Sequence, residues 1–345
     1  MSAWLLQSAP GLAPVLNREM VFTGAVERKQ ELFIKRQRNH DLILLTRPKK
    51  AEAMERLRIA ETVMRCPLYG RFKISKTQLQ TMADELLEIG PRRLVVQVAG
   101  KQFDRRDLSR WLSKELSARG YTFSTDDKDD EVWMICIDEF YYFGIPTMKA
   151  GSGEGRDERE SERHGSLPPS IAAAMAFAGQ AANDDLILDP VCGSGTCLSE
   201  AHAYAPTAQL IGIDIDPEAV KTARANLKSL LSSQQLTLTQ GDSRQAPSGR
   251  QDVTLVLANL PFGRQFGDRG SNPELYRDII KNCLAVAHPE KWRAVVLTSD
   301  MDSLNQALTE FKGLDRKELF RVKIRGELAT ALSLKKSKQG QNRKA

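Results

Sequence analysis

Two short polar motifs in the second half of the chain could form one reaction site. Asp189 opens the run Asp-Pro-Val-Cys-Gly-Ser-Gly-Thr, and the run Asn-Leu-Pro-Phe begins seventy residues later at Asn259. The first motif is typical of a turn that binds a cofactor, because Gly193 and Gly195 permit tight backbone geometry and close approach to a ligand. The second offers a polar acceptor followed by a proline and an aromatic ring. Together they predict methylation of an amino group on a base.

The chemistry expected of the second motif is the orientation of a weakly nucleophilic amine, whose lone pair is delocalised into the purine ring. The side-chain oxygen of Asn259 and the carbonyl of Leu260 can each accept one amine hydrogen and direct the lone pair at a methyl donor. No strong base is needed, because the amine becomes acidic only after the new bond has formed. Pro261 completes this catalytic strip, and Phe262 would stack on the flipped base, contributing about 1–3 kcal/mol. The alternative is a strand-ending turn with a core phenylalanine.

The first motif favours S-adenosylmethionine as the cofactor. The amides that open the helix after the glycine turn can face a carboxylate-bearing ligand. Asp214, nineteen residues after Gly195, ends the next apolar strand, where a carboxylate accepts hydrogen bonds from both ribose hydroxyls. NAD sites share this order, but Leu198 occupies the place of the third glycine, so NAD is less favoured.

Asp242 follows a third predicted strand, where it would accept a hydrogen bond from an adenine amine, although a surface turn is the alternative. The predicted cofactor residues are Ser166, Asp189, Cys192, Gly193, Gly195, Thr196, Asp214, Ile215, Asp242, Ser243 and Asn259.

Composition indicates an ordinary soluble protein of two or three domains. The chain has 345 residues, of which 41% are hydrophobic and 27% charged. No stretch approaches the roughly 20 apolar residues of a membrane span, and Met1 to Pro10 lack the basic segment of an export signal. The five cysteines and four histidines show no metal-ligand spacing. We therefore expect a cytoplasmic protein without a metal site or disulfides.

Charge is concentrated near the start of the chain. Residues 1–76 carry 15 Lys and Arg against 7 Asp and Glu, and the last residues add five cations without an acid. This clustering suits a polyanion partner. A surface that serves only to keep the protein soluble would explain the charge equally well.

The elements that must position these motifs differ between the two halves. The order of elements in residues 1–76 is βαββαβ, which predicts a ferredoxin-like domain. Its strands are expected at 3–9, 31–36, 41–46 and 68–74, and its helices at 11–23 and 49–64. Residues 77–148 are expected to form helices at 78–89 and 105–119 and strands at 94–99 and 132–143. Residues 149–165, rich in glycine and charge, are predicted to be a flexible linker.

From residue 167 onward, helices and strands alternate, which predicts a parallel sheet with crossover helices. Strands are expected at 186–188, 210–213, 236–239, 253–257 and 294–298, and helices at 168–179, 217–231 and 273–287. Residues 317–334 should close the sheet edge as an antiparallel hairpin. Because ligands bind at the carboxyl ends of parallel strands, both motifs should lie at that edge.

Residues 167–334 resemble the Rossmann-like S-adenosylmethionine methyltransferases that act on exocyclic amines. The resemblance lies in the two motifs and in Gly-Ile-Asp-Ile-Asp at 212–216. The runs beginning at Ser166, Leu297 and Gly326 narrow it to the THUMP-domain RNA guanine methyltransferases. In the first half, Pro10-Gly-Leu, Glu19 and Gly24-Ala resemble the ferredoxin-like lead domain of that family, and Gly100-Lys-Gln-Phe-Asp resembles a THUMP domain.

The resemblance implies a monomeric RNA enzyme that holds tRNA with its amino-terminal domains and methylates a guanine amine. Its domains would be ferredoxin-like at 1–76, THUMP-like at 77–148 and Rossmann-like at 166–335, followed by a basic tail at 336–345. The expected RNA-binding residues are Arg28, Lys29, Lys35, Arg36, Arg38, Lys101 and Arg264.

Two positions depart from the family pattern. Many relatives carry Asp in place of Asn259, and many others a second proline in place of Leu260. Both variants keep a carbonyl acceptor. The sequence therefore predicts methylation of an amine, but the two departures leave the identity of the base open. The alternatives are a ribosomal RNA target, an adenine amine, a DNA adenine methyltransferase, and an RNA-binding protein that retains the fold without catalysis.

Overall fold

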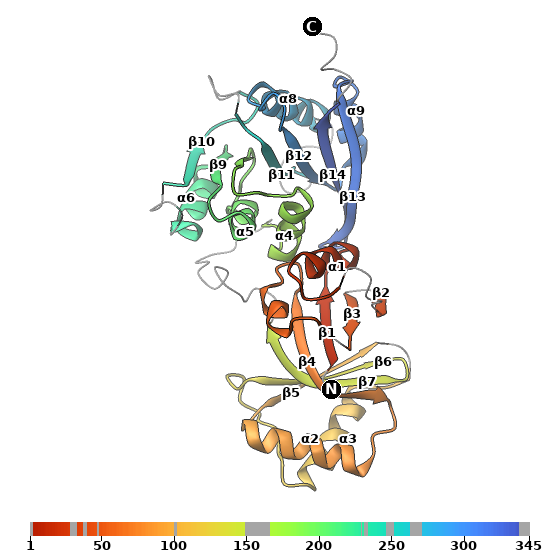
Figure 1. The fold of residues 1–345 in the computed structure, drawn as a ribbon. Coiled ribbons are helices and arrows are strands. Elements are labelled where there is room, and N and C mark those ends of the chain that lie inside the picture. The colour runs from red at the N-terminus through yellow and green to blue at the C-terminus, as the bar shows by residue number, and fades with distance from the viewer. Residues whose placement is uncertain are drawn as a thin grey trace. The chain divides into compact units, whose positions relative to one another are not determined.

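The computed structural model describes residues 3–27, 33–36, 40–46, 48–99, 102–148, 166–228, 230, 234–245, 252–262 and 271–337. The chain divides into two compact units, Met1–Ser8 with Met20–Ala150, and Ala9–Glu19 with Gly151–Ala345. Within the described residues each unit contains a seven-stranded sheet (Figure 1). The predicted linker at 149–165 lies outside the described residues.

The sheet of the first unit has the order β2-β3-β1-β4-β7-β6-β5. Neighbouring strands are antiparallel except for β5 and β6. The strands are β1 (Ala3–Ser8), β2 (Phe33–Arg36), β3 (Asp41–Leu45), β4 (Thr62–Arg71), β5 (Arg93–Ala99), β6 (Glu131–Ile137) and β7 (Phe140–Met148). Because β4 pairs with β7, one sheet continues across the predicted boundary at residue 76.

Two capped helices complete this unit. Helix α2 (Lys76–Ile89) begins with a capping box between Ser75 and Gln78, and the carboxylate of Asp104 caps α3 (Arg105–Ser117). Their apolar faces bury Leu79, Leu86, Leu108 and Leu112, with other residues, in a core with β6 and β7.

Two sequence predictions for this unit are wrong. Residues 49–64 were expected to be one helix, but only the 3-10 helix η1 (Ala51–Arg56) forms, and β4 starts at Thr62. The β-branched residues Thr62 and Val63 pair with β1, so sheet formation overrides the local helical spacing. The strand expected at 132–143 is a hairpin, because Asp138 turns the chain with a φ of 50°.

The sheet of the second unit has the order β10-β9-β8-β11-β12-β14-β13. The first five strands run parallel, and the hairpin of β13 and β14 adds antiparallel to β12. The strands are β8 (Leu186–Asp189), β9 (Gln209–Asp214), β10 (Leu236–Gln240), β11 (Leu255–Asn259), β12 (Arg293–Thr298), β13 (Leu314–Ile324) and β14 (Glu327–Lys336). The predicted parallel sheet and its closing hairpin are confirmed.

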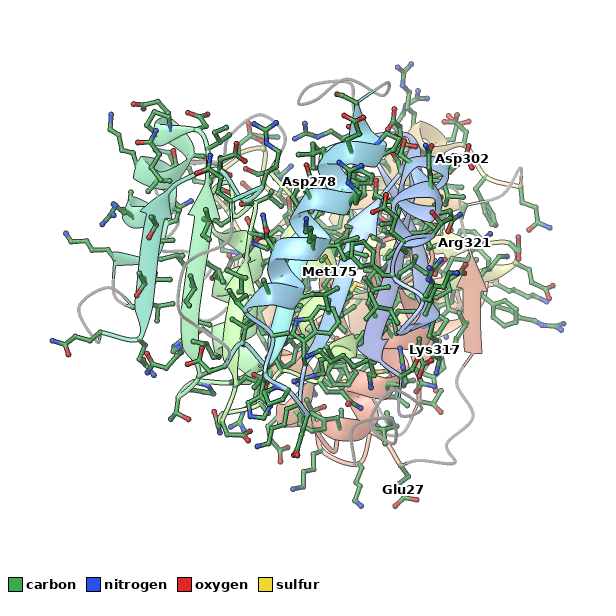
Figure 2. All side chains as sticks on the ribbon, turned by 90° about the horizontal axis from the view of Figure 1, so that it is seen from above. Glu27, Met175, Asp278, Asp302, Lys317 and Arg321 are labelled. Carbon is green, nitrogen blue, oxygen red and sulfur yellow. The ribbon has the colours of Figure 1, made fainter. Side chains whose placement is uncertain are left out.

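Helices cover both faces of this sheet (Figure 1). They are α4 (Pro169–Ala178), α5 (Thr196–Tyr204) and α6 (Pro217–Asn226) on one face and α8 (Asn272–Ala285) and α9 (Met301–Leu308) on the other. Helix α9, capped by Asp300, had no counterpart in the sequence prediction. The outer strand β13 exposes Lys317 and Arg321 (Figure 2), and charged side chains of this kind protect an open sheet edge from pairing.

The early segment Ala9–Glu19 belongs to the second unit and contains the first part of α1 (Ala13–Phe22). The Tyr204 hydroxyl donates a hydrogen bond to the fully buried carboxylate of Glu19. Gly11 has a φ of 100°, and a Cβ atom there would lie 1.9 Å from the backbone oxygen of Arg321. Only glycine fits this contact without moving the backbone.

Among the described residues no helix is both long and apolar enough to cross a membrane.

Candidate methyl-transfer site

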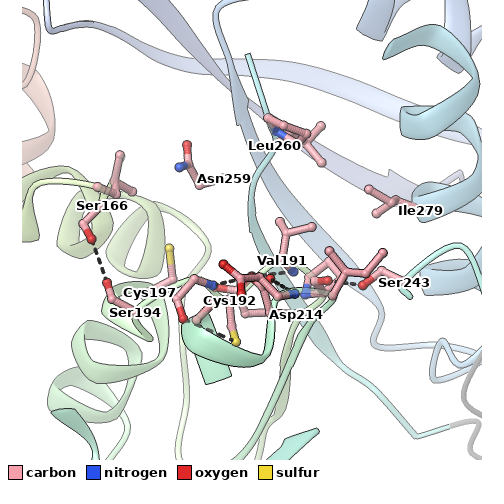
Figure 3. A pocket seen from close by; sticks show the side chains of 18 of the residues that line it. Ser166, Val191, Cys192, Ser194, Cys197, Asp214, Ser243, Asn259, Leu260 and Ile279 are labelled. Atoms are coloured by element: carbon pink, nitrogen blue, oxygen red, sulfur yellow. Dashed lines mark hydrogen bonds between the residues drawn. The ribbon is translucent and has the colours of Figure 1, made fainter. Parts of the chain in front are cut away.

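A cavity of about 610 Å³ lies in the second unit at the carboxyl ends of β8, β9 and β11 (Figure 3). Its volume is in the usual range for small-molecule sites. The lining includes the whole predicted catalytic strip and every predicted cofactor residue except Gly195. The structure therefore brings the two motifs to one site, as their strand-end positions predicted.

The glycine turn after β8 is held by its own backbone and by Asp214. One oxygen of the Asp214 carboxylate accepts the Gly193 amide at 2.8 Å, and the other accepts the Asp216 amide at 3.0 Å. The Ser194 hydroxyl lies 3.0 Å from that of Ser166 (Figure 3) and 3.2 Å from that of Thr196. Asp214 thus fixes the turn while its carboxylate lines the cavity.

The two glycines of the turn have different functions. Gly193 lines the cavity with a φ of 53°. Gly195, with a φ of 83°, precedes α5, and a Cβ atom there would lie 2.6 Å from Leu227 Cδ1. Gly195 thus permits the close packing of the turn against α6 and its continuation, and its role in cofactor binding stays a prediction.

Two carboxylates of the cavity have opposite environments. Complete burial, and secondarily the charge of Asp214, raises the pKa of Asp189 to about 8. Hydrogen bonds from the Arg244 guanidinium, the closest at 2.6 Å, lower the pKa of Asp242. Asp242 is therefore an ionised acceptor, whereas Asp189 holds a proton near neutral pH until a cation comes close.

Other groups of the turn complete its surface. The Ser243 hydroxyl donates to the Pro190 carbonyl, and Ile215 is 62% exposed beside the cavity. Burial raises the pKa of the Cys192 thiol, so this side chain lines the cavity as a neutral group. All five cysteines are buried and form no disulfide.

The catalytic strip follows β11. The Leu260 amide donates to the Leu297 carbonyl of β12 at 2.9 Å, and the Tyr276 hydroxyl donates to the Pro261 carbonyl. Figure 3 shows the Asn259 side chain above the turn that carries Cys192. The Asn259 Oδ1 atom is buried and has no hydrogen-bond partner among the described residues. A buried acceptor of this kind requires a donor, which an amine substrate would provide.

Several lining residues were missed by the sequence analysis. Arg244 comes directly after the predicted Ser243, Leu275 and Ile279 come from α8, and Ile324, Arg325 and Glu327 come from the β13–β14 hairpin. The run that begins at Gly326 is part of the family resemblance, but the sequence alone does not predict that it lines the cavity.

The predicted RNA-binding residues are described only in part. Lys35 forms an ion pair with Asp138 within the first unit, and Arg36 belongs to β2. The remaining predictions, Arg28, Lys29, Arg38, Lys101 and Arg264, lie outside the described residues. No group of three metal-ligating side chains gathers among the residues that are described.

Residues 156–330, about half of the chain, match UPF0020, the RMKL-like methyltransferase domain family. The chain belongs to this family. As a UPF0020 methyltransferase it uses S-adenosylmethionine, and the cavity fits this cofactor. The helix N-terminus after Gly195 suits the ligand carboxylate, Asp214 suits the ribose hydroxyls, and Asp189 suits a cationic group.

Curated relatives of this UPF0020 methyltransferase include two tRNA enzymes. One is the tRNA (guanine(6)-N(2))-methyltransferase THUMP3 of Mus musculus, 28% identical over 50% of this chain and 37% of the relative. The other is the tRNA (guanine(6)-N2)-methyltransferase of Thermus thermophilus, 34% identical over 42% of this chain and 43% of the relative. The matched segments thus span less than half of either relative.

The structure of TrmN from Thermus thermophilus has the same fold. It superposes on the UPF0020 methyltransferase with a TM-score of 0.79 at 22% identity, over 97% of this chain and 100% of TrmN.

Proposed function

We propose that this methyltransferase transfers a methyl group to the exocyclic N2 amine of a guanine in tRNA. The observation that carries the proposal is the buried acceptor Asn259 Oδ1 in the cavity that the cofactor turn also lines. The choice of guanine in tRNA is supported by the names of the relatives from Mus musculus and Thermus thermophilus.

The residues of the catalytic strip would orient the amine and would not deprotonate it beforehand. S-adenosylmethionine supplies an electrophilic methyl group. Asn259 Oδ1 and the Leu260 carbonyl accept the two amine hydrogens, so the nitrogen lone pair points at the methyl carbon. As the new N–C bond forms, the C–S bond breaks and its electron pair stays on sulfur. The amine then loses one proton to water, because its acidity has risen.

Binding of the RNA is proposed for the amino-terminal half. The support is the excess of cations in residues 1–76, together with the resemblance of this half to ferredoxin-like and THUMP domains. Neutralisation of phosphates by Lys and Arg would supply affinity, and the cavity would supply the choice of base.

The test is a comparison of total tRNA from cells with and without the gene. The tRNA is digested and its nucleosides are measured by mass spectrometry, and we expect 2-methylguanosine to decrease in the deletion strain. Loss of a methyladenosine instead, or unchanged tRNA with a loss in another RNA, would contradict the proposal.

A complemented strain separates catalysis from binding. The wild-type gene should restore 2-methylguanosine, whereas Asn259→Ala should not, because the amine is no longer oriented. Purified Asn259→Ala should bind S-adenosylmethionine as tightly as the wild type in isothermal titration calorimetry. Loss of cofactor affinity in this variant would show that Asn259 acts on the cofactor and not on the amine.

A further inference from the structure

The β13–β14 hairpin brings a carboxylate into the cavity that neither the cofactor nor the methyl transfer uses. Glu327 lines the cavity together with Ile324 and Arg325. Ile324 pairs with Glu327, and the two residues between them, Arg325 and Gly326, have φ values of 50° and 89°. These are the torsions of a tight two-residue hairpin turn, so the position of Glu327 follows from strand pairing.

The sheet order places Glu327 on the substrate side of the cavity. Apart from Ser166 and Asn259, the predicted cofactor residues lie at or after the ends of β8, β9 and β10, which are on one side of β11. Strand β14 lies on the other side of β11, beyond β12. Thr298, the last residue of β12, pairs with Thr330, so Glu327 extends past the carboxyl end of β12. Asn259, at the end of β11, therefore separates Glu327 from the cofactor turn.

Glu327 is held in position by a neighbour. The Ser299 hydroxyl donates to Oε2 of Glu327 at 3.0 Å, and the residue is only partly exposed. An ionised carboxylate is an acceptor only and has about four lone-pair positions. It can therefore accept this hydrogen bond and one from a substrate at the same time.

The Watson–Crick edges of the purines give this carboxylate a selective role. Guanine presents an N1–H donor directly beside its N2 amine. Adenine presents a lone pair at N1 beside its N6 amine, which a carboxylate would repel. We propose that Glu327 selects guanine by accepting N1–H while Asn259 and Leu260 orient the N2 amine, an inference that rests on the proposed function. A site built around such a donor rejects a base that lacks it, because the carboxylate then gains no hydrogen bond from the base to replace its hydration.

The experiment compares two bases that both carry a 2-amine. The probe is the tRNA that loses 2-methylguanosine in the deletion strain, assembled from synthetic pieces with guanosine or 2-aminopurine ribonucleoside at the mapped nucleotide. 2-Aminopurine has an acceptor at N1 in place of the donor. The wild type should prefer guanosine on the order of 10- to 100-fold in kcat/KM.

Glu327→Gln should change this preference, because the glutamine amide can donate to N1 of 2-aminopurine. We expect kcat/KM for guanosine to fall about 10- to 100-fold and the preference to narrow to within about threefold. Ser299→Ala releases the Glu327 carboxylate. It should narrow the preference for guanosine over 2-aminopurine, but by less than Glu327→Gln does. The matched control is Glu318→Gln on the exposed face of β13, which should keep the wild-type preference. Cofactor affinity and thermal unfolding report whether each variant is folded.

The outcomes separate the two proposals. If Glu327→Gln is folded and retains the wild-type preference, the selection role is overturned. If Glu327→Gln does not fold, Ser299→Ala decides, because a narrowed preference supports the role and an unchanged preference overturns it. A wild-type enzyme that fails to methylate guanosine at all would instead reject the proposed function.

Discussion

At the scale of single residues, the most unusual group is the carboxyl of Asp189. It is 1% exposed, and it accepts a hydrogen bond from the Val191 amide at 3.1 Å. Burial dominates its environment, and the Asp214 carboxylate adds repulsion, so its pKa rises from 3.8 to about 8. Burial and this repulsion thus keep the group neutral near pH 7, and a cationic ligand would restore its charge.

The raised pKa of Asp189 predicts how stability depends on pH. Between about pH 4 and pH 8 the folded state retains a proton that the unfolded state has released. Stability should therefore fall as pH rises through this window. In thermal unfolding without cofactor, the wild type should lose more stability between pH 5 and pH 8 than Asp189→Asn. Parallel pH profiles for the two proteins would show that Asp189 is already ionised in the folded state.

Residues of the site differed in how well their sequence context revealed them. Asp189, Asp214 and Asn259 each end a parallel strand, so their convergence followed from the strand pattern alone. Glu327 enters the cavity through the register of an antiparallel hairpin, and no local motif specifies which hairpin residue reaches a distant cavity. The packing role of Gly195 against Leu227 likewise depends on a tertiary contact.

At the scale of elements, helix α8 braces the catalytic strip. The Thr298 hydroxyl accepts the Asp300 amide at 3.0 Å and lies 3.0 Å from the Tyr276 hydroxyl. Because the single Tyr276 proton goes to the Pro261 carbonyl, the Thr298 hydroxyl is the donor in this contact. The Tyr276 hydroxyl in turn donates to the Pro261 carbonyl. Tyr276 and Thr298 are fully buried. This directed chain fixes the peptide between Pro261 and Phe262.

Removal of the Tyr276 hydroxyl should make the catalytic strip less rigid without affecting the cofactor turn after β8. Tyr276→Phe leaves a buried carbonyl without its donor, which costs about 1–3 kcal/mol. We expect kcat to fall roughly 10-fold with unchanged affinity for S-adenosylmethionine. Steady-state kinetics and calorimetry measure the two quantities. The control Tyr204→Phe also removes a hydroxyl, but from α5, and should leave kcat unchanged; an equal loss in both variants would point to general destabilisation.

Element prediction succeeded where local periodicity and long-range pairing agreed. The alternation of β8 to β12 with their helices was predicted correctly, and its central strands β8, β11 and β12 are buried apolar runs. The helix expected at 49–64 failed because Thr62 and Val63 pair with β1, a partner more than fifty residues away. Helix α9 was missed because it has only eight residues, a length at which periodicity is a weak signal.

At the scale of the whole molecule, the catalytic unit is discontinuous in sequence. The segment Ala9–Glu19 belongs to it although its other part begins only at residue 151. Gly11 lies against the backbone of Arg321, and Glu19 accepts the Tyr204 hydroxyl. Ala9–Glu19 thus completes a unit whose cavity is lined by residues between Ser166 and Glu327.

Gly11→Ala should therefore destabilise the catalytic unit. The new Cβ would lie 1.9 Å from the Arg321 oxygen at a φ of 100°, and overlap with strain should cost at least ~2 kcal/mol. Urea unfolding of the full chain measures this loss. Gly313→Ala is the matched control, because a Cβ there meets nothing within 4 Å. Equal stability of the two variants would mean that the Gly11 segment does not pack as described.

The contact between Gly11 and Arg321 also constrains the order of events during protein synthesis. Ala9–Glu19 leaves the ribosome well before β13, the strand against which Gly11 packs. At about 5–20 residues per second, Gly11 waits roughly 15–60 s for this contact. A nascent chain that pauses before β13 would therefore hold Ala9–Glu19 without the strand backbone against which Gly11 packs in the finished protein.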